Sequence, residues 1–216
     1  MPLQSIQKIN KSTCLGFWEL NESIAELTQQ LKKLAPATLA LPNFTNNSRQ
    51  QQWLAARLLV YTLLQKFTPE LFLLCTDTWG KPYLENSNYN LSISHTNNHV
   101  AVILSKEFEV GIDIESIHPK VLRVKEKFMT ADELTAAGDC LLKIMIYWCT
   151  KETLYKLYGR KQLLFKEHLG VKTFALKNNG TLEAYINAPG LQKDYFIHYE
   201  NKEDYLLTYC LDQPSD

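Results

Sequence analysis

The stretch from Val110 to Glu115 restricts the possible folds of this chain more than any other, because apolar and acidic residues alternate along it. A two-residue period is that of a β-strand, in which successive side chains point to opposite faces. Ile112 and Ile114 would share one face. Asp113 and Glu115 would share the other, where two like charges repel unless a cation neutralises them or one carboxyl keeps a proton. The stretch therefore predicts a strand that carries either a cation site or an exposed acidic face.

Strand and helix patterns alternate along the rest of the chain. Short apolar or alternating segments predict strands at residues 14–20, 90–94, 100–104, 110–114, 171–176, 182–186, 195–199 and 205–211. Apolar residues with helical spacing predict helices that begin after Asn21 and near Ser48, Val121, Thr130 and Leu141. Because both halves mix helices with antiparallel strands, we expect an α+β fold of two similar lobes, residues 1–108 and 109–216.

Local signals add detail to this pattern. Asn21 is the expected N-cap of the first helix. The sequence Asn178-Asn179-Gly180 predicts a hairpin turn. Short polar turns separate the strand patterns at 90–94, 100–104 and 110–114, which is typical of a three-stranded meander.

The 216 residues include 23 basic and 23 acidic side chains, and 45% are hydrophobic. This balance argues against disorder, and against a protein that holds nucleic acid or an anionic membrane by bulk charge. An anionic ligand must then be bound by a local cluster. No run approaches the ~18 apolar residues of a membrane span, and residues 1–10 lack the apolar core of a signal peptide. We expect a cytoplasmic protein with neither nucleic acid nor a membrane as its partner.

A second polar motif lies on the long helix predicted near residues 141–158. Glu152 and Lys156 are four residues apart, so they project from one helical face. A surface salt bridge accounts for this pair. Alternatively, Glu152 is a third carboxylate that joins Asp113 and Glu115 around one hard cation such as Mg²⁺. Lys156 would then face phosphate groups bound to that cation.

The first half supplies basic residues that could bind an anion. These are Arg49, Arg57, Lys81 after a glycine, and His95 at the end of a strand pattern. Each alone is typical of an ordinary turn or surface. His95 and His99 lack a third residue with suitable spacing for zinc.

Together these segments resemble the 4′-phosphopantetheinyl transferases, specifically the larger monomeric class with two pseudo-symmetric lobes. The resemblance extends from about Ser48 to Leu176. Residues 111–115 and 148–156 fit the family patterns G-[IV]-D-x-E and W-[SC]-x-K-E-x-x-x-K at the expected separation. Residues 49–57, 79–82 and 90–95 fit weaker patterns in the expected order. Thr153 departs from the pattern, because a small residue is usual there.

The resemblance implies an activity. Members of the family transfer the phosphopantetheine arm of coenzyme A to a serine of an apo acyl or peptidyl carrier protein, and they release adenosine 3′,5′-bisphosphate. The implied metal is Mg²⁺, with Mn²⁺ as an alternative. Residues 1–108 would hold the 3′-phosphate and adenine side of coenzyme A, and residues 109–216 the metal and the pyrophosphate. The implied oligomeric state is a monomer.

The resemblance also implies a role for each matching residue. The metal carboxylates would be Asp113, Glu115 and Glu152. The groups that bind coenzyme A would be Arg57, Lys81, Ser94, His95, Lys151 and Lys156, with Lys156 on the pyrophosphate. Glu133 occupies the position proposed to deprotonate the carrier serine, which would make Glu133 and Lys156 the catalytic residues. Thr130-x-x-Glu133 is also a capping box, so a purely structural role for Glu133 stays open.

Two rival functions use the same residues. One is a non-catalytic protein that binds coenzyme A or a carrier domain, which the intact carboxylate trio disfavours. The other is a metal-dependent phosphohydrolase. The sequence offers no obvious nucleophile-activating motif for that reaction beyond Glu133. For the carrier contact we expect the segment 121–128 with Arg123, Lys125 and Lys127, which is equally typical of a solvated helix face.

Overall fold

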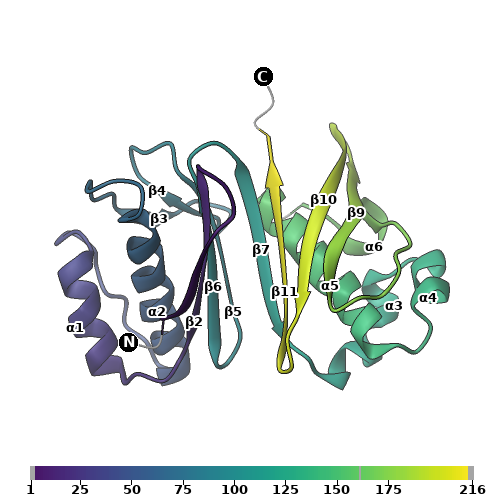
Figure 1. Ribbon diagram of the computed structural model, residues 1–216, viewed down its shortest axis with the longest axis horizontal. Helices are drawn as coiled ribbons and strands as arrows, with labels where there is room; N and C mark the ends of the chain where they lie inside the picture. The colour runs from purple at the N-terminus through teal and green to yellow at the C-terminus, as the bar shows by residue number, and fades with distance from the viewer. Residues whose placement is uncertain (1–2, 161, 214–216) are drawn as a thin grey trace. The chain divides into compact units, whose positions relative to one another are not determined.

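The computed structural model describes residues 3–160 and 162–213, and these divide into two compact units (Figure 1). The first unit extends to Val110 and includes Gln213, and the second runs from Gly111 to Asp212. The ends of the two expected lobes, residues 1–2 and 214–216, lie outside this description. Each unit contains an antiparallel sheet and helices, which confirms the expected α+β class.

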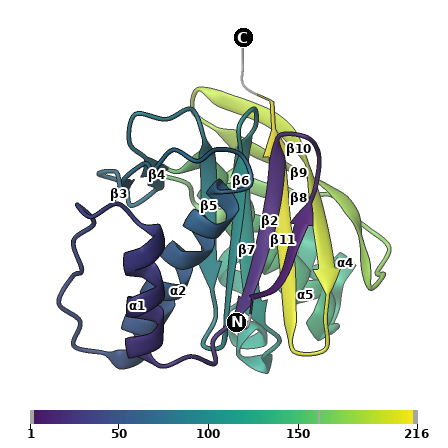
Figure 2. The same cartoon turned by 60° about the vertical axis from the view of Figure 1, so that its left-hand side comes forward.

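The first unit is a four-stranded sheet covered by two helices. In spatial order its strands are β1 (Leu3–Lys8), β2 (Thr13–Glu19), β6 (His99–Ser105) and β5 (Asn90–His95). A separate small hairpin consists of β3 (Leu74–Thr76) and β4 (Pro82–Leu84). The helices are α1 (Ile24–Leu34) and α2 (Asn47–Leu64), which pack side by side (Figure 2). Strand β1 had no counterpart among the predicted strands.

The first helix is capped by a different residue from the one expected. Ser23, not Asn21, is the N-cap of α1, because Ser23 and Glu26 form a capping box. The Ser23 hydroxyl accepts a hydrogen bond from the Glu26 amide at 3.3 Å, and the Glu26 carboxylate accepts one from the Ser23 amide at 2.9 Å. Asn21 has no acidic residue three positions later, so it cannot make this reciprocal pair.

The second unit is a five-stranded sheet with one long helix and several short ones. In spatial order its strands are β7 (Glu109–Ser116), β11 (Tyr205–Asp212), β10 (Leu191–Asn201), β9 (Asn179–Ala188) and β8 (Leu169–Val171). Its helical segments are η1 (Pro119–Arg123), α3 (Lys125–Phe128), α4 (Ala131–Ala137), α5 (Leu141–Tyr158) and α6 (Phe165–His168). Residues of α5 and of one sheet face share a buried core that includes Ile144, Ile146, Leu154, Ile197 and Cys210.

Three predictions for the second unit were wrong. The strand at 110–114 is not the third strand of a meander, because β7 lies beside β11 in the second sheet. No hairpin turn forms at residues 178–180, and the strand expected at 171–176 is wrong, because β8 ends at Val171 and residues 172–176 are not in a strand. Asn179 and Gly180 instead extend β9, where they pair with Glu200 and Tyr199 of β10. Pairing with a long neighbouring strand outweighs the local turn preference, because it adds backbone hydrogen bonds and cross-strand contacts.

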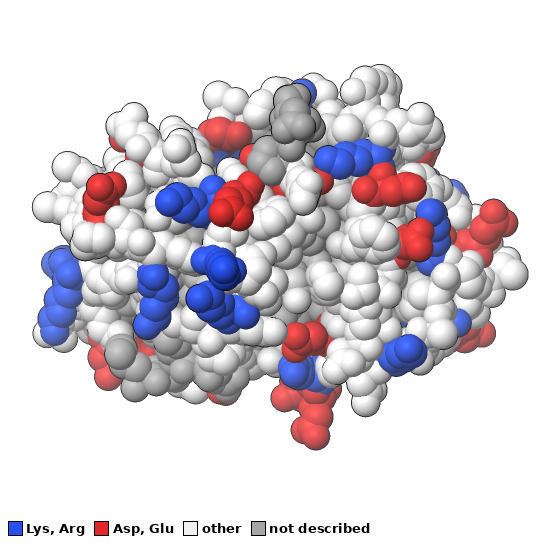
Figure 3. All heavy atoms as spheres, turned by 45° about the horizontal axis from the view of Figure 1, so that its top comes forward, with Lys and Arg blue, Asp and Glu red and all other residues white. Residues whose placement is uncertain are grey.

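Charged side chains of both signs are distributed over the surface. Figure 3 shows several Lys and Arg side chains next to Asp and Glu side chains on the face drawn. This agrees with the zero formal net charge of the chain. Among the described helices, none has both the length and the apolar composition that crossing a membrane requires.

The contact that positions the candidate site is the close approach of α5 to β7 at Gly111. A Cβ atom at residue 111 would overlap the backbone carbonyl oxygen of Thr153 and lie 3.0 Å from the Cβ of Leu157. Two hydroxyl groups hold α5 to the sheet nearby, because Thr153 Oγ1 and Thr208 Oγ1 are 2.6 Å apart. Thr208 Oγ1 also donates to the carbonyl oxygen of Cys149 at 3.0 Å. The unusual Thr153 thus has a partner on β11.

From this contact onward, β7 and α5 run alongside each other over equal distances. The four residue-to-residue steps along β7 from Gly111 to Glu115 rise ~13 Å at ~3.3 Å per step. The nine residue-to-residue steps along α5 from Leu157 back to Trp148 also rise ~13 Å at ~1.5 Å per step. The acidic face of β7 therefore meets the face of α5 that carries the second polar motif.

We predict that Gly111→Ala destabilises the protein. The added methyl group meets a backbone oxygen, which cannot change rotamer, so α5 must move away from β7. Such overpacking costs about 1–3 kcal/mol, more than the gain from a less flexible unfolded chain. Urea unfolding monitored by circular dichroism measures the change.

Gly180→Ala is the matched control, because the nearest atom to a Cβ there is a ring carbon of Tyr199 at 3.2 Å. A smaller loss is expected for this variant. Equal stabilities for Gly111→Ala and the unchanged protein would contradict the close contact.

Candidate functional site

The candidate site contains three carboxylates from two elements. Asp113 and Glu115 lie on the face of β7 that Gly111 turns toward α5, and Glu152 lies on α5. Asp113 is buried, whereas Glu115 and Glu152 are half-buried. The carboxylates that spacing and resemblance assigned to one site are thus neighbours in the second unit.

Their charges act on one another. Burial raises the pKa of Glu152 to about 7, and the negative charge of Asp113 adds to this effect, followed by the weaker effect of Glu115. Burial also raises the pKa of Glu115, again with a contribution from Asp113. Lys156 opposes both shifts. The group therefore carries more negative charge than its surroundings stabilise.

Two side chains of α5 hold the carboxylates of β7. Lys156 Nζ donates to Asp113 Oδ1 at 2.7 Å. Trp148 Nε1 donates to Glu115 Oε1 at 2.9 Å. Trp148 and Lys156 lie four residues before and four residues after Glu152, so all three project from one side of the helix. The sequence analysis did not predict a role for Trp148. The i, i+4 spacing between Trp148 and Glu152 could have indicated that the two side chains share one helical face.

A buried thiol completes the contacts of Asp113. Cys149 is fully buried, and its pKa is raised well above the ordinary value, first by burial and then by Asp113 and Glu115. The thiol therefore stays protonated and is a hydrogen-bond donor to the neighbouring carboxylate. The sequence offered no signal for this contact.

The donor set fits a hard divalent cation by its chemistry, but it is not arranged as a closed coordination sphere. Within the described ranges, no three His, Cys, Asp or Glu side chains are grouped so that they could hold a metal ion. Asp113 and Glu115 are instead oriented by Lys156 and Trp148. Asp113 nevertheless contributes to the raised pKa of both Glu115 and Glu152, and carboxylate oxygens are the ligands that Mg²⁺ prefers.

Glu133 and Lys151 form a buried ion pair. Lys151 Nζ lies 2.8 Å from Glu133 Oε2, and the two side chains are 0% and 5% exposed. The capping box is present, because the Thr130 hydroxyl accepts from the Glu133 amide and the Glu133 carboxylate accepts from the Thr130 amide. The roles implied for this pair, general base and coenzyme A contact, stay predictions.

Arg57, in the first unit, has an unusual environment for a cation. Its guanidinium lies 3.5 Å from the ring centroid of Trp53, and Nη1 donates to the Trp53 carbonyl oxygen at 3.3 Å. Burial lowers the pKa of Arg57 to about 10. Its Nε is buried without a hydrogen-bond partner in the part of the chain that the structure describes. An anion would supply that partner.

The other basic residues expected at the site also belong to the first unit. Lys81 follows a turn in which Gly80 has a φ of 92°, a conformation that glycine adopts without strain. Lys81 Nζ lies 3.1 Å from Glu109 Oε2. At the end of β5, Ser94 is buried and His95 is exposed.

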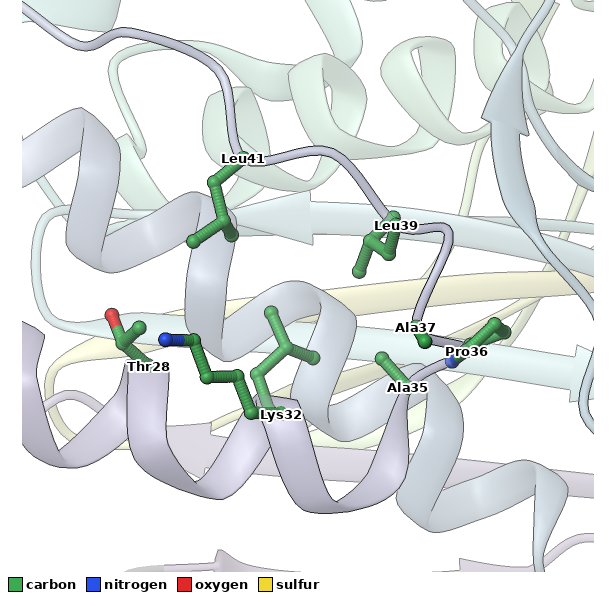
Figure 4. Close-up of a pocket in the computed structure, with 8 residues that line it drawn as sticks. Thr28, Lys32, Ala35, Pro36, Ala37, Leu39 and Leu41 are labelled. Carbon is green, nitrogen blue, oxygen red and sulfur yellow. The ribbon is translucent and has the colours of Figure 1, made fainter.

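A separate cavity of about 300 Å³ lies in the first unit between α1 and the segment that follows it (Figure 4). Its lining is mostly apolar and consists of Thr28, Leu31, Lys32, Ala35, Pro36, Ala37, Leu39 and Leu41. It has no carboxylate, so its chemistry differs from that of the acidic group in the second unit.

Comparison with known proteins identifies the class. Residues 109–210 match the family model of the 4′-phosphopantetheinyl transferase superfamily. The matched segment contains all three carboxylates, Trp148, Lys156 and the Glu133–Lys151 pair. This segment of the chain belongs to the 4′-phosphopantetheinyl transferase superfamily, whose members act on coenzyme A and carrier proteins. No curated protein matches the chain.

We predict that Glu152 makes stability depend on pH. Between its ordinary value of 4.5 and about 7, the folded protein keeps a proton on Glu152 that the unfolded chain has lost. Stability from this group therefore falls as pH rises through that window. Relative to the unchanged protein, Glu152→Gln should gain about 1–3 kcal/mol between pH 5 and pH 8.

Urea unfolding in EDTA at the two pH values measures this difference. Both proteins keep the other side chains of the acidic group, so the difference between their stabilities reports the substitution at residue 152. Glu183→Gln, on β9, controls for the loss of a carboxylate elsewhere. The same stability difference at pH 5 and at pH 8 would refute the predicted shift.

Proposed function

We propose that the chain transfers the 4′-phosphopantetheine arm of coenzyme A to a serine of an apo acyl or peptidyl carrier protein and releases adenosine 3′,5′-bisphosphate. The observation that carries the proposal is the meeting of the Asp113/Glu115 face of β7 with Glu152 and Lys156 of α5. It lies in the segment that belongs to the transferase superfamily. A monomer in the cytoplasm remains the expected state.

Asp113, Glu115 and Glu152 would hold a divalent metal, Mg²⁺ or Mn²⁺. When bound there, such a metal would neutralise charge on the pyrophosphate oxygens, which is the main requirement of phosphoryl transfer. The raised pKa values of Glu115 and Glu152 support this role, because a cation relieves the repulsion that causes part of each shift. Trp148 orients the Glu115 carboxylate through its indole N–H.

Lys156 would bring a positive charge to the same phosphates. It lies within 2.7 Å of Asp113, so it is already beside one of the carboxylates. Its ammonium group has three N–H donors and can serve a carboxylate and a phosphate oxygen together. In this role it stabilises negative charge on the leaving group.

The first unit would bind the 3′-phosphate and adenine side of coenzyme A through Arg57, Lys81, Ser94 and His95. Support comes from Arg57, whose buried Nε has no hydrogen-bond partner in the described chain and whose pKa burial lowers to about 10. A phosphate would provide both an acceptor and an opposite charge.

The carrier protein would dock on the segment from η1 to α3. Arg123 and Lys127 are exposed there, and Lys125 lies 3.1 Å from Asp139. Such basic groups complement an acidic partner. A solvated surface is the alternative, and charge reversal of Arg123 and Lys127 distinguishes the two by its effect on the KM for the carrier.

One assay tests the function. The protein is incubated with coenzyme A, Mg²⁺ and an apo carrier protein, and the carrier is weighed by mass spectrometry. A mass gain of one phosphopantetheine is the expected result. An unchanged carrier with bound coenzyme A would identify a binding protein instead, and hydrolysed coenzyme A would identify a phosphohydrolase.

We predict that Glu152→Ala lowers the rate of transfer by about a hundredfold or more, because the metal loses one of its three carboxylates. The fold should persist, since the truncation removes a destabilising charge. Carrier mass and circular dichroism are measured in parallel, with Glu183→Gln as the control. Transfer at the unchanged rate would rule out the metal assignment.

We predict that Arg57→Ala and Lys81→Ala each weaken binding of coenzyme A about tenfold or more, because a charge-assisted hydrogen bond is lost. Dephospho-coenzyme A lacks the 3′-phosphate, so its binding should change much less. Calorimetric titration with both ligands measures this. Equal losses for the two ligands would contradict a 3′-phosphate site.

A further inference from the structure

The Glu133–Lys151 ion pair is the most deeply buried pair of opposite charges that the described residues show. Lys151 is 0% exposed and Glu133 is 5% exposed. Taking two charges out of water is costly unless each is fully compensated by partners. The contacts of the two side chains therefore indicate what the pair does.

Lys151 uses every donor that it has. Its Nζ donates to Glu133 Oε2 at 2.8 Å, to the Phe128 carbonyl oxygen at 2.6 Å and to the Phe165 carbonyl oxygen at 3.2 Å. An ammonium group has three N–H bonds, and three acceptors surround this one. Phe128 ends α3 and Phe165 begins α6, so one side chain joins α5 to both short helices and to α4.

Both carboxylate oxygens of Glu133 also accept hydrogen bonds. Its Oε2 accepts from Lys151 and from the Thr130 amide, the latter at 2.8 Å. Its Oε1 accepts from the Val171 amide at 2.9 Å, which adds strand β8 to the connected elements. A general base must present an oxygen to the incoming hydroxyl group. Both oxygens of Glu133 are directed to groups of the chain itself.

The neighbouring residue on α5 is Glu152. On an ideal helix, consecutive side chains are about 100° apart, so fixing Lys151 on one side fixes the direction of Glu152. A turn of α5 by one residue would bring Glu152 to the place of Lys151. The other tethers of this helix to the acidic group, Lys156 and Trp148, are only half-buried.

We propose that Glu133 and Lys151 are positioning residues that set the rotation of α5 and thereby place Glu152 beside Asp113 and Glu115. The inference rests on the proposed metal site. It assigns the pair neither proton transfer nor contact with coenzyme A.

The test compares Glu133→Gln, Lys151→Met and the double variant. In Glu133→Gln, the amide group must direct an N–H either at the Val171 amide or at the donors of Thr130 and Lys151. In Lys151→Met, a buried carboxylate loses its counter-charge. In the double variant neither uncompensated charge remains, although the hydrogen bonds that anchor α5 are gone.

Two readouts do not depend on catalysis. Mn²⁺ affinity is measured by electron paramagnetic resonance without coenzyme A, and exchange of the α5 amides is followed by hydrogen–deuterium mass spectrometry. Each single variant should bind Mn²⁺ at least tenfold more weakly and exchange faster along α5. The double variant should lie between the single variants and the unchanged protein in both readouts.

A general base would behave differently. Glu133→Gln would then abolish transfer with unchanged Mn²⁺ affinity and α5 exchange, and the double variant would be no better than Glu133→Gln. That result would overturn the proposal. Should a single variant fail to fold, the double variant decides, because wild-type Mn²⁺ affinity and exchange in it would also overturn the positioning role.

The control is the exposed pair Lys172–Glu183, with side chains 48% and 51% exposed. Lys172→Met with Glu183→Gln should leave both readouts unchanged. If the unchanged protein binds no Mn²⁺, the proposed metal site fails. Exchange along α5 then decides the positioning role separately, and unchanged exchange in all three variants would overturn it.

Discussion

The close contact between α5 and β7 is the constraint on which the candidate site depends. Gly111 leaves room for the carbonyl oxygen of Thr153, and backbone atoms cannot yield to a neighbour by changing rotamer as a side chain can. Once this point is set, a strand and a helix advance by similar distances over two and four residues. A carboxylate pair on alternate strand positions therefore meets helix residues at four-residue spacing, among them Glu152. The geometry of the site follows because two residues of a strand and four residues of a helix cover similar distances.

Electrostatics is the physical basis for proposing a ligand at this site. Burial and neighbouring carboxylates raise the pKa of Glu152 to about 7, and Lys156 offsets only part of the effect. Unfavourable charge of this kind is stored at functional sites and is relieved by the ligand. The neutral net charge of the chain thus conceals an acidic group in one unit and a buried, incompletely hydrogen-bonded Arg57 in the other. The proposed metal and phosphate would supply the complementary charges.

Local patterns predicted local features well. The period of two located β7, the helical spacing located α5, and Thr130-x-x-Glu133 identified a capping box that the structure contains. Features that depend on distant residues were missed. Lys151 meets Glu133 across 18 positions of sequence, and that contact depends on how α5 is rotated. The hairpin expected at residues 178–180 gave way to pairing with β10, since a turn preference is weaker than a full set of strand contacts.

The sequence by itself determined the elements, the face on which each polar side chain lies and the family pattern, because these depend on spacings of two to four residues. Only the tertiary structure decided which faces meet. In the folded protein, β7 pairs with β11 instead of β6. The Glu115 carboxylate accepts a hydrogen bond from Trp148, and Lys151 donates to backbone carbonyl groups. These choices arise from burial and hydrogen bonding between residues far apart in the chain. Such interactions gain free energy only when the whole sheet and its helices assemble together.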